Sequence, residues 1–361
     1  KVGLAIGDYL PVQVSVYDAF NNVVAGSTAS ITLAVSTNPG GGTLAGTVTV
    51  AAVSGVATFP ILSIDKAGIG YTLVATSGVL TPTPASAAFN ITSGAAAKLG
   101  FTVQPTSAIA GAALSPAFQV TVQDTLGNTV TGSTASITVA IGTNPSAGVL
   151  SGTATVAAVA GVASFPGLSI NKSGAGYTLG ATSGVLTSAA SAAFNINPGA
   201  AAKLGFTVQP TTTTAGVAMA PAVQVAVQDA LGNIVTASIA SVTVAISANP
   251  SAGVLSGAMT VAAVAGVASF PSLSINRSGS GYTLGATSGV LTAATSAAFD
   301  INFGPAARLA FAVQPSNATA GVSVAPAVQV AVEDSQGNRV TTSTASITVA
   351  IDNNPSAGFL S

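Results

Sequence analysis

The chain of 361 residues contains no histidine, cysteine or tryptophan, and its charged residues are 8 Lys or Arg and 9 Asp or Glu. Without imidazole or thiol side chains, it has no histidine base, thiol nucleophile or disulfide, and it lacks the preferred ligands of zinc. Charged residues make up 5% of the chain, against roughly 25% in ordinary globular proteins. Because the net charge is −1 and the cations are scattered, we expect no nucleic-acid partner.

Long apolar runs are also missing, although the mean hydropathy of +0.68 is high. A transmembrane helix needs roughly 20 predominantly apolar residues in a row. The best candidate, residues 154–170, is shorter and contains Gly161 and Pro166. The high hydropathy comes from Ala and Val spread along the chain, so we expect no membrane span in this segment.

An internal repeat of about 105 residues dominates the sequence. The segments YDAFNN, QDTLGN, QDALGN and EDSQGN place their Asp residues 106, 105 and 105 positions apart, and about three-quarters of positions are identical between residues 96–200 and 201–305. Such a period is too long for the common solenoid units. We divide the chain into repeats covering residues 1–95, 96–200, 201–305 and 306–361, of which the first lacks its opening strand and the last ends about halfway.

Each repeat has the length and pattern of an immunoglobulin-like β-sandwich. Apolar residues alternate with polar ones between turn residues, which indicates half-buried antiparallel strands. The fold class that we predict is all-β, with tandem immunoglobulin-like antiparallel β-sandwich domains in an elongated rod. The strands expected in the second repeat are Lys98–Gln104, Ala117–Gln123, Ser136–Ile141, Gly152–Ala158, Val162–Phe165, Tyr177–Ala181 and Ala192–Ile196.

Two residue types recur at structural positions. A Tyr follows a glycine-rich corner near the start of a late strand, which is typical of a tyrosine corner whose hydroxyl bonds to nearby backbone; the alternative is a stacking platform for sugars. An Asp opens each repeated turn, where its carboxylate can cap the turn. The candidate structural residues are Tyr71, Tyr177, Tyr282, Asp18, Asp124, Asp229 and Asp334.

The residue strings AAKLGFTVQP, GVASFPGLSI, GYTLGATSG and SAAFNI resemble the tandem bacterial immunoglobulin-like repeats of large surface proteins. Invasin- and intimin-like adhesins and cell-surface fibres belong to that group. The resemblance covers essentially the whole chain. It implies the immunoglobulin-like fold and an extracellular or cell-surface location, but it implies no binding partner and supplies no active-site residues.

Catalytic and metal sites find little support in the sequence. A Ser–Lys pair would need one of five lysines, and Lys98 and Lys203 are replaced by Arg308 in the last repeat. An arginine cannot act as a neutral base. The same replacement argues against isopeptide bonds, and the eight Asp are too isolated in sequence for a calcium loop. We expect no enzyme activity, no cofactor and no metal.

Four Asn-x-Ser/Thr sequons are candidate glycosylation sites. They lie at Asn90, Asn171, Asn276 and Asn317. Asn171 and Asn276 occupy equivalent positions in a loop that has room for a glycan, although a chain so rich in Ser and Thr contains several sequons by chance.

The linkers between repeats are short, as in residues 92–97, 197–202 and 302–307. Linkers of this length limit the movement of neighbouring repeats relative to each other, and for this reason we expect a rod. The partial first and last repeats of the chain indicate a stretch of a longer array, or else strand exchange between successive subunits.

The function that we expect is that of a structural, non-catalytic segment of an extracellular cell-surface fibre or filament. Its partners would be adjacent repeats, neighbouring chains and glycans. The alternative is the spacer or binding stalk of an adhesin that recognises carbohydrate or a host or neighbour-cell protein.

Overall fold

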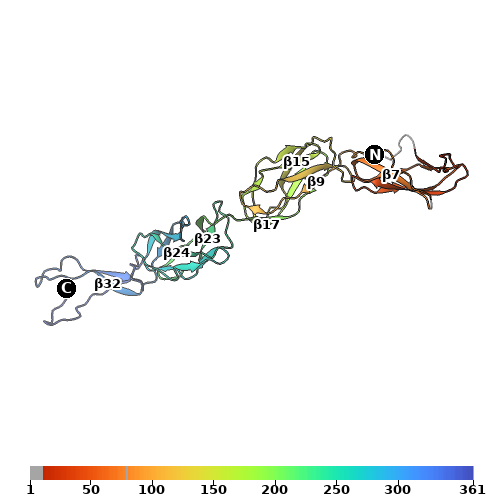
Figure 1. The fold of residues 1–361 in the computed structure, drawn as a ribbon. Helices are drawn as coiled ribbons and strands as arrows, with labels where there is room; N and C mark the ends of the chain where they lie inside the picture. The colour runs from red at the N-terminus through yellow and green to blue at the C-terminus, as the bar shows by residue number, and fades with distance from the viewer. Residues whose placement is uncertain (1–10, 79, 361) are drawn as a thin grey trace. The chain divides into compact units, whose positions relative to one another are not determined.

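The computed structural model describes residues 11–78 and 80–360, which form strands connected by turns and loops (Figure 1). The chain divides into two compact units, Lys1–Asn197 and Pro198–Ser361, and each is treated separately below. Within the described ranges, no helix has the length and apolar character needed to cross a bilayer.

In the first unit, the first repeat has a four-stranded sheet of order β4-β2-β7-β8 and the pairs β1-β5 and β3-β6. Its strands are β1 (Val12–Ser15), β2 (Ser30–Thr37), β3 (Leu44–Gly46), β4 (Thr49–Ala51), β5 (Val56–Phe59), β6 (Leu62–Ile64), β7 (Gly68–Thr76) and β8 (Phe89–Ile91).

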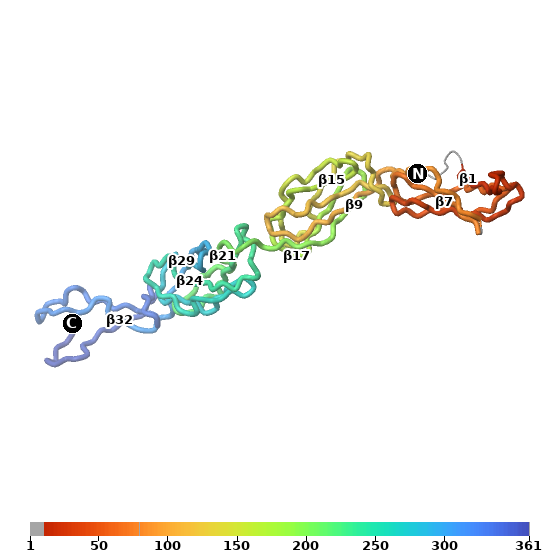
Figure 2. The backbone as a smooth tube through the Cα atoms, in the orientation of Figure 1, coloured from red at the N-terminus to blue at the C-terminus, as the bar shows by residue number. Residues whose placement is uncertain are grey.

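The second repeat follows in the same unit, and Figure 2 traces its backbone, in yellow to green, back and forth along this body. Its strands are β9 (Lys98–Val103), β10 (Ala108–Ile109), β11 (Phe118–Gln123), β12 (Ser136–Ile141), β13 (Leu150–Ser151), β14 (Thr155–Ala157), β15 (Val162–Phe165), β16 (Ser169–Ile170), β17 (Gly174–Tyr177), β18 (Leu179–Thr182), β19 (Ala189–Ala190) and β20 (Phe194–Asn197). They form sheets of order β9-β11-β15, β14-β12-β18-β19 and β10-β20-β17, with β13 paired to β16.

Alternating apolar residues of these sheets meet in one core. Val120 of β11 and Val139 of β12 come from different sheets and are both fully or almost fully buried in the same cluster. Phe118 stacks on Phe165 with ring centroids 5.2 Å apart. Sheets that share a core across their inner faces form a β-sandwich. The prediction of an all-β, antiparallel sandwich fold is therefore confirmed.

The second unit repeats this arrangement in residues 203–302. Its strands are β21 (Lys203–Val208), β22 (Thr213–Thr214), β23 (Val223–Gln228), β24 (Ser241–Ala248), β25 (Leu255–Ser256), β26 (Thr260–Ala262), β27 (Val267–Phe270), β28 (Ser274–Ile275), β29 (Gly279–Thr287), β30 (Ala294–Thr295) and β31 (Phe299–Asn302). Val223 replaces Phe118 in this core, and Met219 replaces Leu114; both are buried.

The opening strand forms close to its predicted range and is followed by a second strand that was not predicted. The chain forms β9 at Lys98–Val103, passes Pro105 and then adds β10 to a different sheet. The pair β10–β20 is parallel, as is β22–β31 in the second unit. Proline has no N–H to donate and so ends the first ladder. The sequence did not predict the parallel pairing of these two short pairs.

The last repeat contains β32 (Arg308–Val313) and β33 (Gln329–Glu333), which pair with each other. Beyond them the chain runs as loops (Figure 1). Residues 343–351 have the same sequence, STASITVAI, as residues 133–141, but they form no strand, whereas Ser136–Ile141 is β12. In the second repeat β12 pairs with β14 and β18, whereas residues 343–351 have no paired strand in the described part of the chain.

The shared core predicts a local stability test. Phe165→Ala should destabilise the second repeat by about 3–5 kcal/mol, because it removes a buried ring and leaves a cavity. Hydrogen exchange of β11 and β15 in the full chain, followed by mass spectrometry, measures the change. Val185→Ala, at a fully exposed side chain, is the control and should change stability by less than about 0.5 kcal/mol. Equal exchange in the two variants would contradict the assignment of this core.

Candidate functional site

A buried tyrosine holds one loop in each of the first three repeats. The side chains of Tyr71, Tyr177 and Tyr282 are fully buried. Their hydroxyls donate to the carbonyl oxygens of Lys66, Lys172 and Arg277 at 2.9, 2.9 and 3.0 Å. Each acceptor lies five residues upstream, which is the arrangement of a tyrosine corner.

Small residues make room for this hydroxyl. At Gly148, a Cβ would lie 2.8 Å from the hydroxyl oxygen of Tyr177. The amide of Asn144 closes the same loop, because it donates to the carbonyl oxygen of Gly148 and accepts from its N–H. The hydroxyl is therefore enclosed by the protein's own backbone, which leaves the ring no face for a sugar.

The second recurring feature is a turn opened by Asp and closed by Asn four residues later. In the second repeat, Oδ1 of Asp124 accepts hydrogen bonds from the N–H groups of Leu126 and Asn128, each at 2.9 Å. Oδ2 accepts from the side-chain amide of Asn128 at 3.0 Å and from the N–H of Gly94, in the linker, at 2.9 Å. This carboxylate fixes the turn and also ties the linker to it.

Within the first unit, this turn meets the tyrosine-held loop of the preceding repeat. The amide of Asn128 donates from Nδ2 to the carbonyl oxygen of Asp65 at 3.0 Å, and its Oδ1 accepts from the N–H of Ala67 at 3.0 Å. The ammonium of Lys66 donates to the carbonyl oxygen of Leu126 at 3.4 Å. We call this set of contacts, Asp65–Ala67 with Gly94 and Asp124–Asn128, the first joint.

The second unit contains an equivalent set, which we call the second joint. The Nδ2 of Asn338 donates to the carbonyl oxygen of Asn276 at 3.0 Å, and its Oδ1 accepts from the N–H of Ser278 at 2.9 Å. Arg277 donates from Nη1 to the carbonyl oxygen of Gly337 at 3.0 Å. The linker N–H of Gly304 donates to Asp334 at 2.8 Å. The two joints, in separate units, thus use the same asparagine, backbone and linker atoms at equivalent positions, while the acceptor of the cation is shifted by one residue.

The turn carboxylates are held in their ionised form. Burial raises the pKa of Asp124, but hydrogen bonds from the Asn128 side chain, Gly94, the Asn128 backbone and Leu126 outweigh it, so the pKa lies below its ordinary value. The same balance lowers the pKa of Asp229 and Asp334. The pKa of Asp18 is lowered chiefly by hydrogen bonds from the backbone and side chain of Asn22.

Sequence reasoning singled out the Asp of each turn and missed the Asn. Asn22, Asn128, Asn233 and Asn338 all stand four residues after the Asp. The spacing from Asp to Asn is therefore visible in the sequence of every repeat. The Asn was missed because a side-chain amide has no catalytic or metal-binding chemistry to draw attention to it. Its oxygen accepts and its NH₂ group donates, so it can bind a backbone N–H and a backbone C=O together.

The cations of the repeats have structural contacts. Lys98 and Lys203 donate to the carbonyl oxygens of Thr125 and Ala230 in the turns, each at 3.2 Å. Arg308, their counterpart, forms the single salt bridge found among the described residues, with Glu333 at 3.0 Å. These contacts place the three cations beside turn carbonyls or a strand neighbour.

The candidate glycosylation residues differ in their surroundings. Asn90 and Asn317 are exposed, whereas Asn171 and Asn276 are half-buried. The Oδ1 of Asn171 accepts the N–H of Val149, and that of Asn276 accepts the N–H of Val254, both at 2.8 Å. The first repeat has Asp65 at this position, and its carboxylate accepts the N–H of Thr43 at 2.7 Å. An Asp cannot carry an N-linked glycan, so the feature that the three repeats share is this hydrogen bond.

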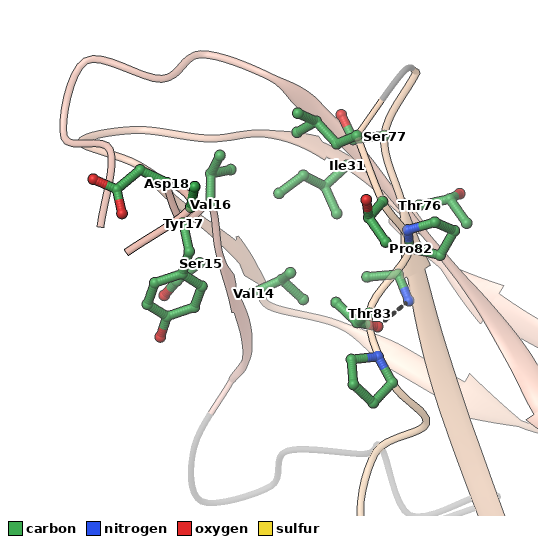
Figure 3. Close-up of a pocket in the computed structure, with 15 residues that line it drawn as sticks. Val14, Ser15, Val16, Tyr17, Asp18, Ile31, Thr76, Ser77, Pro82 and Thr83 are labelled. Carbon is green, nitrogen blue, oxygen red and sulfur yellow. Dashed lines mark hydrogen bonds between the residues drawn. The ribbon is translucent and has the colours of Figure 1, made fainter. Parts of the chain in front are cut away.

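The described part of the chain contains no group of three or more acidic side chains placed to hold a metal ion. No buried side-chain oxygen or nitrogen there lacks a hydrogen-bond partner. A cleft of about 430 Å³ lies in the first repeat and is lined mainly by Val, Thr, Ser, Ala and Pro (Figure 3). It contains a single carboxylate, Asp18, and no base, so its lining favours an apolar occupant.

No family model matches the chain, and no curated protein is similar to it in sequence. Similarities to solved structures do exist. The Escherichia coli adhesin FdeC is 17% identical over 80% of this chain and 89% of its own, with a TM-score of 0.31. The surface layer protein SbsC, domains 4–9, is 17% identical over 83% of this chain and 43% of its own, with a TM-score of 0.22.

An enzyme is also among these structures. A β-glycosidase from Bacteroides vulgatus is 9% identical over 56% of this chain and 24% of its own, with a TM-score of 0.27. Since all three TM-scores are below 0.5, these similarities decide neither the family nor the function of this chain. Its function has to be argued from its own residues.

The first joint predicts the effect of removing one amide. Asn128→Ala should leave the N–H of Ala67 without its acceptor and speed its hydrogen exchange at least about tenfold, since a lost bond that leaves a partner unpaired costs about 1–3 kcal/mol. Amide exchange measured by NMR on segmentally labelled full chain reports this residue. Asn22→Ala removes the equivalent amide from the first turn and should leave Ala67 unchanged. Unchanged exchange in Asn128→Ala would contradict the joint.

The turn carboxylates predict acid sensitivity. Their pKa values are lower in the folded chain than the ordinary value of about 3.9, so they stabilise the fold at higher pH. That contribution is lost as pH falls through the folded pKa. Asp124→Asn should remove part of this pH dependence and lower the stability of the second repeat at neutral pH. Urea unfolding between about pH 7 and 2 checks both statements, and a wild type equally stable throughout would refute them.

Proposed function

We propose that this chain is a structural, non-catalytic segment of an extracellular or cell-surface fibre, in which immunoglobulin-like repeats are fixed to one another by hydrogen-bonded joints. The observation that carries the proposal is the occurrence of the same joint between residues 65–67 and 124–128 and between residues 276–278 and 334–338. A chain of independent modules would not need its turns to bind the neighbouring repeat.

The chemistry of the repeats supports a mechanical role. The distinctive polar side chains, Asp124, Asn128 and the Tyr71 hydroxyl, are directed at backbone atoms of this chain. A catalytic site instead leaves a nucleophile or base facing an open pocket. The residues that recur from repeat to repeat therefore serve to build and connect the repeats. Their proposed effect is to keep neighbouring repeats at a fixed distance.

Surface location belongs to the same proposal. The lack of charge leaves broad sheet faces of Thr, Ser, Ala and Gly, and such faces favour association with neighbouring copies or a sugar coat. The resemblance to bacterial surface repeats agrees with this setting. Immunolabelling of intact and permeabilised source cells with an antibody against the repeat tests it, and labelling that requires permeabilisation would refute a surface location.

Spacing across the first joint can be measured directly, because the chain contains no cysteine. Spin labels at Val53→Cys and Val185→Cys, both at strongly exposed side chains, report the distance between the first and second repeats by double electron–electron resonance. We expect a narrow distribution in the otherwise wild-type chain and a broader one after Asn128→Ala. The Asn22→Ala variant is the matched control and should stay narrow. A broad distribution before any change at the joint would overturn the proposed spacer role.

A further inference from the structure

The cations of the chain are scattered along the sequence but recur at two positions of the repeat. Of the eight Lys and Arg residues, six stand either in a tyrosine-held loop or at the start of the opening strand of a repeat. The first position holds Lys66, Lys172 and Arg277, and the second holds Lys98, Lys203 and Arg308. Lysine changes to arginine at both positions together, so what the two positions share is a positive charge rather than one side chain.

The first joint brings two of these cations to one turn. The ammonium of Lys66, from the first repeat, donates to the carbonyl oxygen of Leu126 at 3.4 Å. The ammonium of Lys98, from the second repeat, donates to the carbonyl oxygen of Thr125 at 3.2 Å. Two positive groups from different repeats thus lie beside neighbouring carbonyls of the same turn.

The second joint brings two guanidinium groups to the equivalent turn. A Cβ on Gly337 would lie 2.5 Å from Nη2 of Arg308 and 3.6 Å from Nη1 of Arg277. The two groups therefore approach one point from different repeats, like the ammonium groups of the first joint. Because like charges repel each other, this approach creates a positive site that an anion would stabilise.

The carboxylates of the first joint are engaged by other groups. Asp124 is buried, and its two oxygens accept the four hydrogen bonds of the turn and the linker. The carboxylate of Asp65 accepts the N–H of Thr43 in its own repeat. Among the residues that the structure describes, Lys66 and Lys98 form no ion pair. Each ammonium has three N–H donors, so this pair has donors left for an external anion.

The second joint keeps the same groups available. Glu333 accepts from Nε of Arg308 at 3.0 Å, so this ion pair does not use the Nη groups beside Gly337. Asp334 is completely buried in its turn. A planar guanidinium has N–H groups that match the oxygens of carboxylate or phosphate. Arginine at this joint can therefore bind the same anion as lysine at the first.

We propose that the two cations of the first joint, and those of the second, bind a phosphate group. Phosphate as a monoester carries about −1.5 to −2 charges at neutral pH, which matches two cations better than the single charge of a carboxylate does. Both ammonium and guanidinium groups bind its oxygens. The bound group would connect a cation of one repeat to a cation of the next. This inference goes beyond the proposed spacer role, which needs no ligand.

An NMR titration of the full chain, labelled over residues 96–200, tests binding at the first joint. Inorganic phosphate at constant ionic strength should shift the amide signals of residues 125–128 along a saturating curve, whereas chloride should not. Lys66→Gln and Lys98→Gln should each weaken binding at least about tenfold, because each removes a charge-assisted hydrogen bond.

The matched control is Lys98→Arg, which keeps the charge as Arg308 does in the second joint and should bind phosphate like the wild type. Equal affinity in the wild type and Lys66→Gln, or shifts that chloride reproduces, would overturn the inference. The distance measurement across the first joint would be unaffected by that outcome, so the spacer proposal is tested separately.

The phosphate can be free or carried on a polysaccharide, and a second titration distinguishes the two sources. Dextran bearing phosphate monoesters is compared with inorganic phosphate at equal phosphate concentration, with unmodified dextran as the control. A polymer with many phosphates can occupy more than one joint, so a carried ligand should bind at least about tenfold more tightly. Equal affinity would identify free phosphate as the ligand, whereas equal binding of unmodified dextran would overturn the inference.

Discussion

One amide group per joint carries the connection between repeats. The side chain of Asn128 accepts one backbone N–H and donates to one backbone carbonyl of the preceding repeat, while Tyr71 holds the same loop from inside its own sandwich. The core of one repeat is thereby linked to the turn of the next through the loop at residues 65–67. Most of these bonds join neutral groups or the backbone, so salt does not screen them as it screens surface ion pairs. A chain with 5% charged residues can therefore still fix its joints.

The joints also explain which positions vary. The first joint uses the carbonyl of Asp65 and the N–H of Ala67, and the second uses the same backbone atoms of Asn276 and Ser278. Since no side-chain atom of these loop residues enters the two bonds, the joint does not restrict their identity. The turn contributes side chains instead, and there Asp and Asn recur in every repeat. The residues that recur in every repeat are thus those that contribute side-chain atoms to the joint, while the residues that contribute only backbone atoms vary.

Much of the fold was predictable from alternation, because a strand with one buried face must alternate. The strands β11, β12 and β15 were expected almost to the residue. Two-residue strands such as β10 were missed, since a pair of residues has no period to detect. The joint could not be predicted because its partners lie about 60 residues apart, and an Asn in a turn signals only local bonding. The segment STASITVAI shows the remaining limit, since it is a strand at Ser136–Ile141 and irregular at residues 343–351.

That last difference has a physical cause. A strand is stabilised by the neighbours with which it pairs and packs. Ser136–Ile141 pairs with β14 and β18, and its Ile137 and Val139 are buried in the shared core. Residues 343–351 have no paired strand in the described part of the chain, and their Val349 and Ile351 stay 43% and 41% exposed. The alternation of apolar residues therefore states which face a strand can bury, but the strand forms only where neighbours pair with it and cover that face.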